Sequence, residues 1–302
     1  MRSLIAAWLI ICVAVAFVSS QLTRIVAMGD LHGDLKNTLT ILRFANLVDA
    51  DGHWAGNDTI FVQTGDVLDR GLDTIKLYDL IQQLREEAEE AGGKVIPLFG
   101  NHEIQNLKGD WRYVNPKEVE TFGGMDERIK AFRPDGFIGS YLMPLNMTTK
   151  VGRTVFCHGG IHPDFARNGL DWINDQTHEE LLRYIESHGH QDPHGVFGGN
   201  GPTWYRGYAL DDEATVCPLL DEALTLLEAD RMVLGHTVQR DGKIHTRCNG
   251  KVVLIDIGIS YVYGGHRGVL EIKGDHITAI YEHGRTPLNT PTHKKHPIHD
   301  EF

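Results

Sequence analysis

Cysteine and basic residues are scarce in this sequence, and their scarcity excludes several classes of protein. Only four cysteines occur among 302 residues, and no two stand at the spacing of a thiolate zinc site. Lysine and arginine total 29 against 41 aspartates and glutamates, so the formal net charge is −12. Such a chain matches a nucleic-acid backbone poorly, and we expect no nucleic-acid partner. The sequence also lacks internal repeats, and beyond residue 20 it has no apolar run long enough to span a bilayer.

The first twenty residues are typical of a signal peptide. Met1-Arg2 gives a positive start, an apolar run extends from Leu4 to Val18, and two small serines follow it. A transmembrane anchor is the alternative interpretation. Because the run is shorter than the ~20 residues that a bilayer requires, we predict cleavage after residue 20 and a mature form without a membrane span.

Three short motifs agree with the secretory pathway. Asn57-Asp-Thr59 and Asn146-Met-Thr148 are N-glycosylation acceptors. The chain ends in His299-Asp-Glu-Phe302, which differs in its last residue from a signal for return to the endoplasmic reticulum. We therefore expect a glycoprotein of the endoplasmic reticulum lumen, with secretion as the alternative.

Three cysteines remain once the predicted signal peptide is removed. An oxidising compartment permits a disulfide, and Cys217 and Cys248 could form one. Cys157 lies inside an apolar segment and is predicted to be a buried thiol. Sequence spacing alone leaves the pairing open.

Strand-like and helical patterns alternate from residue 23 onward and predict an α/β fold. Strands are expected at 24–28, 59–63 and 94–99, with helices at 35–48 and 73–91 between them. This order is typical of βαβ units around a buried sheet, where sites collect at the carboxyl ends of strands. Residues 104–150 predict a helical insertion that could cover the site. The later expected elements are helices at 179–186 and 215–229 and strands at 154–157, 231–234, 243–247, 252–257, 269–272 and 277–282. One domain at 21–286, followed by a loose tail at 287–302, is the simplest organisation.

Five polar loops each follow an apolar strand, and each places Asp, His or Asn beside glycine. Oxygen and imidazole ligands without thiolate suit manganese, iron, zinc or magnesium. A single loop of this composition is typical of a solvated turn. Five of them at successive strand ends predict that their side chains converge on metal.

These loops resemble the signature motifs of the calcineurin-like metallophosphoesterases. Their order and spelling are most similar to the Shewanella-like branch of the phosphoprotein phosphatases. The motifs are Gly29-Asp-Leu-His-Gly33, Gly65-Asp-Val-Leu-Asp-Arg-Gly71, Gly100-Asn-His-Glu103, His158-Gly-Gly160 and Gly235-His236. The resemblance covers residues 25–272 and implies two central mixed β-sheets flanked by helices, an αββα sandwich.

The resemblance also implies two divalent cations, with manganese expected first and iron or zinc as alternatives. It assigns Asp30 and His32 to the first cation and makes Asp66 the carboxylate that bridges both. The second cation would be held by Asn101, His158 and His236. A bridging anion is needed because two cations ~3.5–4 Å apart repel each other strongly.

Four further assignments concern the reaction itself. The resemblance makes His102 the general acid and Asp69 the carboxylate that orients its imidazole. The alternative is that His102 is another metal ligand or a structural hydrogen-bonding residue. Arg70 and Arg206, together with Asn101, would bind the phosphoryl group. A surface ion pair is the alternative for Arg70.

The expected activity is hydrolysis of phosphomonoesters by direct attack of a metal-bridging hydroxide. A phosphorylated protein or peptide is the expected substrate, and the resemblance favours phosphotyrosine. Tyr205, Tyr261 and Tyr263 could pack against an aromatic leaving group, or could serve only the core. The eukaryotic serine/threonine phosphatases of this family carry a Ser-Ala-Pro-Asn-Tyr segment in a loop over the site near their C-terminus. The corresponding residues of this chain, 256–265, have a different sequence. A preference for phosphoserine and phosphothreonine that depends on that loop is therefore not expected here.

Two other functions remain open at this stage. Dinucleoside polyphosphate hydrolases of the diadenosine tetraphosphate type share these motifs, and residues 128–139 could belong to either group. A luminal binding protein without catalytic activity is the other alternative. The complete set of acid, bridge and ligand residues argues against a binding role alone.

Overall fold

The computed structural model describes residues 23–187 and 192–290. The predicted signal peptide at 1–20 and the motif at 299–302 lie outside the described residues. Among the helices of the described part, none combines the length and the apolar character that crossing a membrane would take.

A six-stranded mixed sheet forms the first half of the fold. Its strand order is β11-β10-β9-β1-β2-β3. Strands β1 (Arg24–Met28), β2 (Ile60–Gln63) and β3 (Lys94–Pro97) are parallel, and α1 (Leu35–Phe44) and α2 (Thr74–Glu90) connect them. The antiparallel strands are β9 (Gly268–Lys273), β10 (His276–Tyr281) and β11 (Gly284–Pro287). The βαβ units expected from the sequence therefore build the parallel half of this sheet.

A five-stranded mixed sheet forms the second half, in the order β4-β5-β6-β8-β7. Strands β5 (Thr154–Cys157), β6 (Arg231–Leu234) and β8 (Val252–Leu254) are parallel and buried at every position. The antiparallel edges are β4 (Thr148–Val151) and β7 (His245–Arg247). Buried residues of both sheets belong to one continuous hydrophobic core. The predicted pair of mixed sheets flanked by helices is confirmed.

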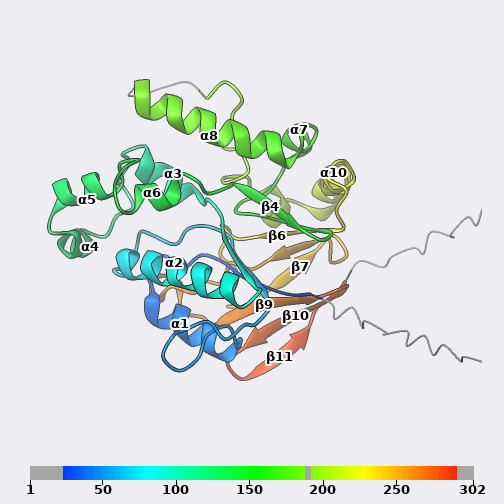
Figure 1. Ribbon diagram of the computed structural model, residues 1–302. Helices are drawn as coiled ribbons and strands as arrows, with labels where there is room; N and C mark the ends of the chain where they lie inside the picture. The colour runs from blue at the N-terminus through cyan, green and yellow to red at the C-terminus, as the bar shows by residue number, and fades with distance from the viewer. Residues whose placement is uncertain (1–22, 188–191, 291–302) are drawn as a thin grey trace, which may run out of the picture.

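The remaining helices lie beside the second sheet or in the segments that connect the strands. Figure 1 shows α7 (Pro163–Ala166), α8 (Gly169–Ser187) and α10 (Glu213–Leu226) on the side of the five-stranded sheet. The short elements that follow β3 are α3 (Asn101–Leu107), α4 (Pro116–Val119), η1 (Glu120–Phe122), α5 (Met125–Ala131) and α6 (Gly139–Leu142). Two further short elements are α9 (Gly207–Leu210) and η2 (Tyr261–Tyr263).

Three differences from the sequence-based expectation concern the start, the end or the presence of a main element. The segment expected to be helical through residue 150 ends in strand β4, which pairs with β5. Helix α8 starts ten residues before the expected position, because its buried face includes the polar residues Asn174, Thr177 and Glu180 and so lacks a clear apolar stripe. Strand β11 was not expected, because all four of its residues are exposed and show no apolar alternation.

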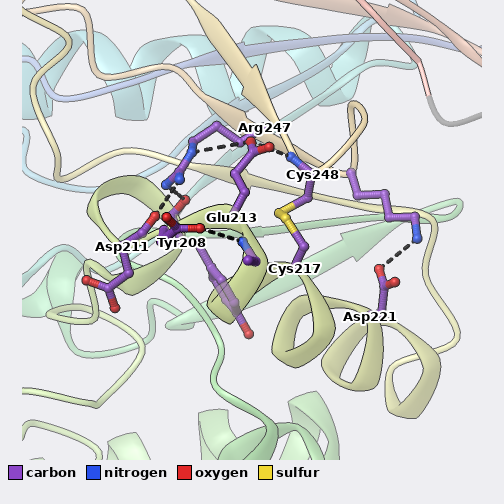
Figure 2. Close-up of a disulfide and its surroundings, with 10 residues drawn as sticks. Tyr208, Asp211, Glu213, Cys217, Asp221, Arg247 and Cys248 are labelled. Carbon is purple, nitrogen blue, oxygen red and sulfur yellow. Dashed lines mark hydrogen bonds and ion pairs between the residues drawn. A yellow bond between two sulfur atoms is a disulfide. The ribbon is translucent and has the colours of Figure 1, made fainter.

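A disulfide joins Cys217 of α10 to Cys248, which follows β7. Figure 2 shows this link together with the Arg247 side chain, which reaches back toward the start of α10. Arg247 donates a hydrogen bond to the Tyr208 carbonyl oxygen over 2.7 Å and lies 3.5 Å from Glu213. The disulfide between Cys217 and Cys248, which the sequence alone could not decide, is therefore present in the structure. Cys157 is a buried free thiol, as predicted.

Candidate active site

The polar loops at the strand ends are joined to one another by backbone hydrogen bonds. The amides of Leu31 and His32 donate to the Asp66 carbonyl oxygen over 2.9 and 3.0 Å. The Gly235 amide donates to the His158 carbonyl oxygen over 2.9 Å. The His236 amide donates to Asp30 Oδ1 over 3.0 Å and so links the two sheets. The convergence expected from the sequence is what the fold produces.

Several site residues have left-handed backbone conformations that non-glycine residues rarely adopt. The φ angles are 42° at His32, 54° at Asp66, 67° at Asp69, 66° at Arg70 and 67° at His236. Each such conformation costs about 1 kcal/mol or more, and such costs concentrate at functional sites. The surrounding fold therefore holds these residues in backbone conformations that they would not adopt on their own.

Asp66 lies at the centre of the cluster. Its Oδ2 atom is 3.2 Å from His158 Nε2 and 3.7 Å from the Nε2 atoms of both His32 and His102. Burial alone would raise the pKa of the Asp66 carboxyl, but His158 and His102 outweigh it and hold this pKa well below its usual value. The group is therefore a carboxylate that faces several imidazoles at once.

Three imidazoles are oriented by backbone carbonyl oxygens, which can only accept hydrogen bonds. His32 Nδ1 lies 3.1 Å from the Leu68 oxygen, and His158 Nδ1 lies 2.9 Å from the Thr64 oxygen. His236 Nε2 lies 3.2 Å from the Trp204 oxygen. Each ring therefore donates through one nitrogen and leaves the lone pair of the other available as a metal ligand.

The donor set fits two divalent cations that share Asp66. Ligand atoms of Asp66, His158 and His236 lie within 4.8 Å of one another, and so do those of Asp66, His32 and His102. Asp30 adds a carboxylate 3.9 Å from His32 Nε2, and Asn101 Oδ1 lies 3.0 Å from His158 Nε2. The six expected ligand residues are thus brought together, all of them buried. Buried oxygen and imidazole donors of this kind suit the divalent metals expected from the sequence.

His102 and Asp69 form a close pair beside this cluster. Asp69 Oδ2 lies 2.7 Å from His102 Nδ1 and also accepts a hydrogen bond from Asn106 Nδ2 over 2.9 Å. Burial lowers the pKa of the His102 imidazole, but Asp66 and Asp69 outweigh burial and raise it above its usual value. The Nε2 atom faces Asp66. The 2.7 Å contact of Nδ1 with Asp69 is the geometry expected of a proton donor whose ring is oriented by a carboxylate.

The chain matches the calcineurin-like phosphoesterase family over residues 23–240. It is 36% identical over 300 residues to Shewanella-like protein phosphatase 2 of Arabidopsis thaliana, covering 83% of this chain and 75% of that protein. It is 30% identical over 298 residues to Shewanella-like protein phosphatase 1 of Plasmodium berghei, covering 92% of this chain and 82% of that protein. The chain is a Shewanella-like member of the calcineurin-like phosphoesterases.

The solved structures agree with this assignment. The crystal structure of a cold-active protein-tyrosine phosphatase from a psychrophilic Shewanella species has a TM-score of 0.77 and 29% identity, covering 89% of this chain and 81% of that one. This phosphoesterase is accordingly a hydrolase that acts on phosphoesters, as predicted.

The two arginines predicted to bind phosphate lie next to different residues of the cluster, Arg70 near His102 and Arg206 next to His236. The guanidinium carbon of Arg70 lies 4.5 Å from the centre of the Tyr113 ring, and its Nε atom has no hydrogen-bond partner among the described residues. Arg206 donates from Nη1 to the His236 carbonyl oxygen over 2.7 Å and to Thr237 Oγ1 over 3.1 Å. Both groups are half-buried cations next to the ligand residues.

Glu103 supports the site in a way that the sequence analysis did not assign. Its two carboxylate oxygens accept from the amides of Asp66, Val67 and Gly100 over 2.9, 2.8 and 2.8 Å. Tyr78 donates a further hydrogen bond over 3.1 Å. Glu103 thereby ties the second loop to the third. Its place three residues after the N-cap of α3, typical of a capping box, was the available signal.

Two tyrosines lie next to the imidazoles of the cluster. The Tyr113 ring is 4.8 Å from His102, and the Tyr263 ring is 5.0 Å from His32. Tyr205, by contrast, packs in the core against Tyr208 with ring centres 4.9 Å apart, and Tyr261 is 55% exposed. Of the three tyrosines considered from the sequence, only Tyr263 therefore contacts the site. Tyr113 was missed, because its segment shows only weak periodicity.

Proposed function

We propose that this protein is a phosphatase that requires two divalent cations and removes phosphate from phosphoproteins, with phosphotyrosine preferred. The observation that carries the proposal is the convergence of five buried ligand residues around a sixth, Asp66, directly beside the His102–Asp69 pair. The relatives are named as protein phosphatases, and the similar crystal structure is named as a protein-tyrosine phosphatase.

The cations would be held by Asp30, His32 and Asp66 on one side and by Asp66, Asn101, His158 and His236 on the other. When bound, they supply Lewis-acid chemistry that activates water and polarises the phosphoryl group. The chain supplies the positive charge that surrounds the substrate. Arg70 and Arg206 bind the phosphoryl oxygens through their planar guanidinium groups, and Asn101 offers its amide nitrogen to the same group.

His102 completes the reaction as the proton donor. Its Nδ1 is held by Asp69, so Nε2 faces Asp66 and the ligand cluster, where we expect the leaving oxygen of a bound substrate. Donation of the Nε2 proton to that oxygen produces a neutral alcohol or phenol. Proton transfer of this kind contributes about 10²–10⁴-fold to the rate, most for the poorest leaving groups.

Tyr113 and Tyr263 give the preference for phosphotyrosine a physical basis. Aromatic rings attract one another beyond simple burial by about 0.5–1.5 kcal/mol. A phenolic leaving group next to His102 lies within reach of both rings, whereas the short side chains of phosphoserine and phosphothreonine gain little. The contribution of Tyr113 is reinforced by Arg70, which is stacked on the same ring.

A matched peptide series tests this proposal. Metal-stripped protein is supplied with manganese, iron or zinc and assayed with one peptide that carries phosphotyrosine, phosphoserine or phosphothreonine, and with a dinucleoside polyphosphate. We expect metal-dependent turnover that is fastest with phosphotyrosine. Tyr113→Leu and Tyr263→Leu should raise KM for phosphotyrosine selectively, while Tyr261→Leu serves as the exposed control. Faster turnover of the dinucleotide would contradict the phosphoprotein assignment.

We also propose that the protein acts in the lumen of the endoplasmic reticulum. The disulfide between Cys217 and Cys248 and the exposed acceptors Asn57 and Asn146 support an oxidising, glycosylating compartment. Glycosidase digestion of the cellular protein should increase its gel mobility, and Asn57→Gln with Asn146→Gln should abolish that change. A protein that digestion leaves unchanged would contradict this location.

A further inference from the structure

Arg128 of α5 is a fully buried cation in the segment that follows the third loop. Its side chain is 0% exposed to solvent. The guanidinium carbon lies 4.5 Å from the centre of the Phe132 ring, 5.1 Å from that of Trp111 and 5.3 Å from that of Phe122. These three rings form an aromatic cage around Arg128. Because burying a charge is costly unless it is paired, the site must hold compensating anions.

The compensating anions are Glu118 and Asp69. Arg128 Nη2 lies 3.3 Å from Glu118 Oε2 and 3.4 Å from Asp69 Oδ1, and both carboxylates are themselves buried. Glu118 also accepts a hydrogen bond from Thr74, the first residue of α2. The Nε and Nη1 atoms of Arg128 have no hydrogen-bond partner among the described residues. An arginine with two unpaired donors is a poor stabilising element, so its position requires another reason.

The reason lies in the second carboxylate oxygen of Asp69. Oδ2 faces His102 Nδ1 over 2.7 Å and Asn106 Nδ2 over 2.9 Å, while Oδ1 faces Arg128. Asp69 lies in a loop and has a left-handed backbone conformation, which persists only when surrounding residues hold it in place. The orientation of its carboxylate therefore depends on contacts with other segments. Arg128 and Asn106 hold the plane of the carboxylate from two directions.

We propose that Arg128 is a positioning residue, which keeps Asp69 in the orientation that makes His102 an efficient proton donor. The inference rests on the proposed function, because it requires His102 to act as the general acid. It also gives α4, η1 and α5 a part in the chemistry, although they supply no group that touches the substrate. Helix α4 supplies Glu118, η1 supplies the Phe122 ring of the cage, and α5 carries Arg128 itself.

The test compares substrates with good and poor leaving groups. Arg128→Met keeps an unbranched side chain of similar thickness, although a shorter one, and removes the guanidinium with its charge. The leaving group of 4-nitrophenyl phosphate, 4-nitrophenolate, departs without protonation. With this substrate we expect kcat to stay within about threefold of wild type. With a phosphotyrosine peptide we expect kcat to fall by about tenfold or more, at unchanged KM and unchanged metal content. Arg128→Lys should recover part of the loss, and Arg133→Met, an exposed change in the same segment, should leave both substrates unaffected.

A purely structural role predicts a different pattern. Both substrates would then slow equally, in proportion to a lower folded fraction, and this result would overturn the proposal. If Arg128→Met does not fold, Arg128→Gln carries the same expectation with a polar side chain of smaller volume. An unchanged ratio of the two substrates in the folded variant would also overturn it.

His102→Asn separates this inference from the proposed function. If His102→Asn slows both substrates equally, then the general-acid assignment fails, and the Arg128 inference fails with it. If His102→Asn affects mainly the poor leaving group and Arg128→Met does not, only the Arg128 inference fails. In the double variant Arg128→Met with His102→Asn we expect no loss beyond that of His102→Asn alone, since both act through one proton donor. Additive losses would contradict the proposal.

Discussion

Asp66 is the single residue on which most buried groups of the site depend. One of its oxygens faces three imidazoles, and the other accepts the His102 amide over 3.0 Å. Its carbonyl oxygen anchors the first loop and its amide contacts Glu103. A carboxylate in this place compensates the positive charge that two cations would bring into a buried site. Removing that charge should therefore affect metal binding before it affects the fold.

Asp66→Asn tests this dependence with an almost isosteric side chain. We expect the variant to fold, to lose bound metal and to lose turnover by several orders of magnitude, because an amide cannot bridge two cations. Elemental analysis of the purified protein gives the metal content, and an aryl phosphate gives the turnover. Asp164→Asn, an exposed change away from the ligands, is the matched control. A variant that retains wild-type metal content would refute the bridging role.

At the scale of the elements, the sequence allowed the parallel strands and the five site loops to be predicted, because apolar strands followed by polar, glycine-flanked turns are local signals. The start of α8 could not be predicted, since Asn174 and Glu180 on its buried face are polar and find their partners only in the folded chain. The left-handed backbone at Asp69 and the contacts of Tyr113 likewise arise from residues far apart in sequence. Long-range packing leaves no local pattern to detect.

The link between α10 and the β7 edge is an element whose energetic contribution can be measured. The disulfide joins residues 31 positions apart. Closing a loop of that length in the unfolded chain stabilises the fold by about 3–4 kcal/mol in the chain-entropy description. We expect Cys217→Ser with Cys248→Ser to lower the free energy of unfolding in urea by about this amount. The control variant Cys157→Ser breaks no disulfide and shows the effect of replacing a buried thiol. Equal free energies of unfolding for the double variant and wild type would contradict the estimate.

At the scale of the whole molecule, the proposed metal ligands come from both sheets. Asp30, His32, Asp66 and Asn101 follow strands of the six-stranded sheet, whereas His158 and His236 follow strands of the five-stranded sheet. The hydrogen bond from the His236 amide to Asp30 also joins the two halves. Cations shared between the halves would bind the folded state only, and they would stabilise the packing of one sheet on the other.

Metal removal should accordingly lower the stability of the whole molecule. We expect the melting temperature of wild type to fall on treatment with a chelator and to recover on addition of manganese, iron or zinc. Asp66→Asn should melt at the same temperature with and without the metal, because it lacks the shared ligand. Differential scanning calorimetry provides the measurement. A metal-dependent shift of equal size in Asp66→Asn would show that the stabilising cations bind elsewhere.

Glu271 of β9 gives the folded chain a defined response to acid. Its Oε1 atom lies 2.7 Å from Arg24 Nε and 3.7 Å from Lys273 Nζ, and its other oxygen contacts Arg285. Burial alone would raise the pKa of the Glu271 carboxyl, but the hydrogen bond and charge of Arg24, with the other two cations, outweigh burial and lower it below its usual 4.5. Glu271 thus joins β1 to the antiparallel half of its sheet.

The sign of the resulting pH dependence follows from linkage. Because the pKa of Glu271 is lower in the folded than in the unfolded chain, its contribution to stability is present above about pH 4.5 and is lost as the pH falls through the folded value. We expect Glu271→Gln to be less stable than wild type at pH 7 and the difference to narrow steadily below pH 4.5, measured by urea unfolding across the range. Glu282→Gln, which removes a more exposed ion pair with Arg267, should change stability little at any pH. A gap between wild type and Glu271→Gln that stays constant from pH 7 to pH 3 would mean that Glu271 stabilises the sheet through packing and neutral hydrogen bonds rather than through its charge.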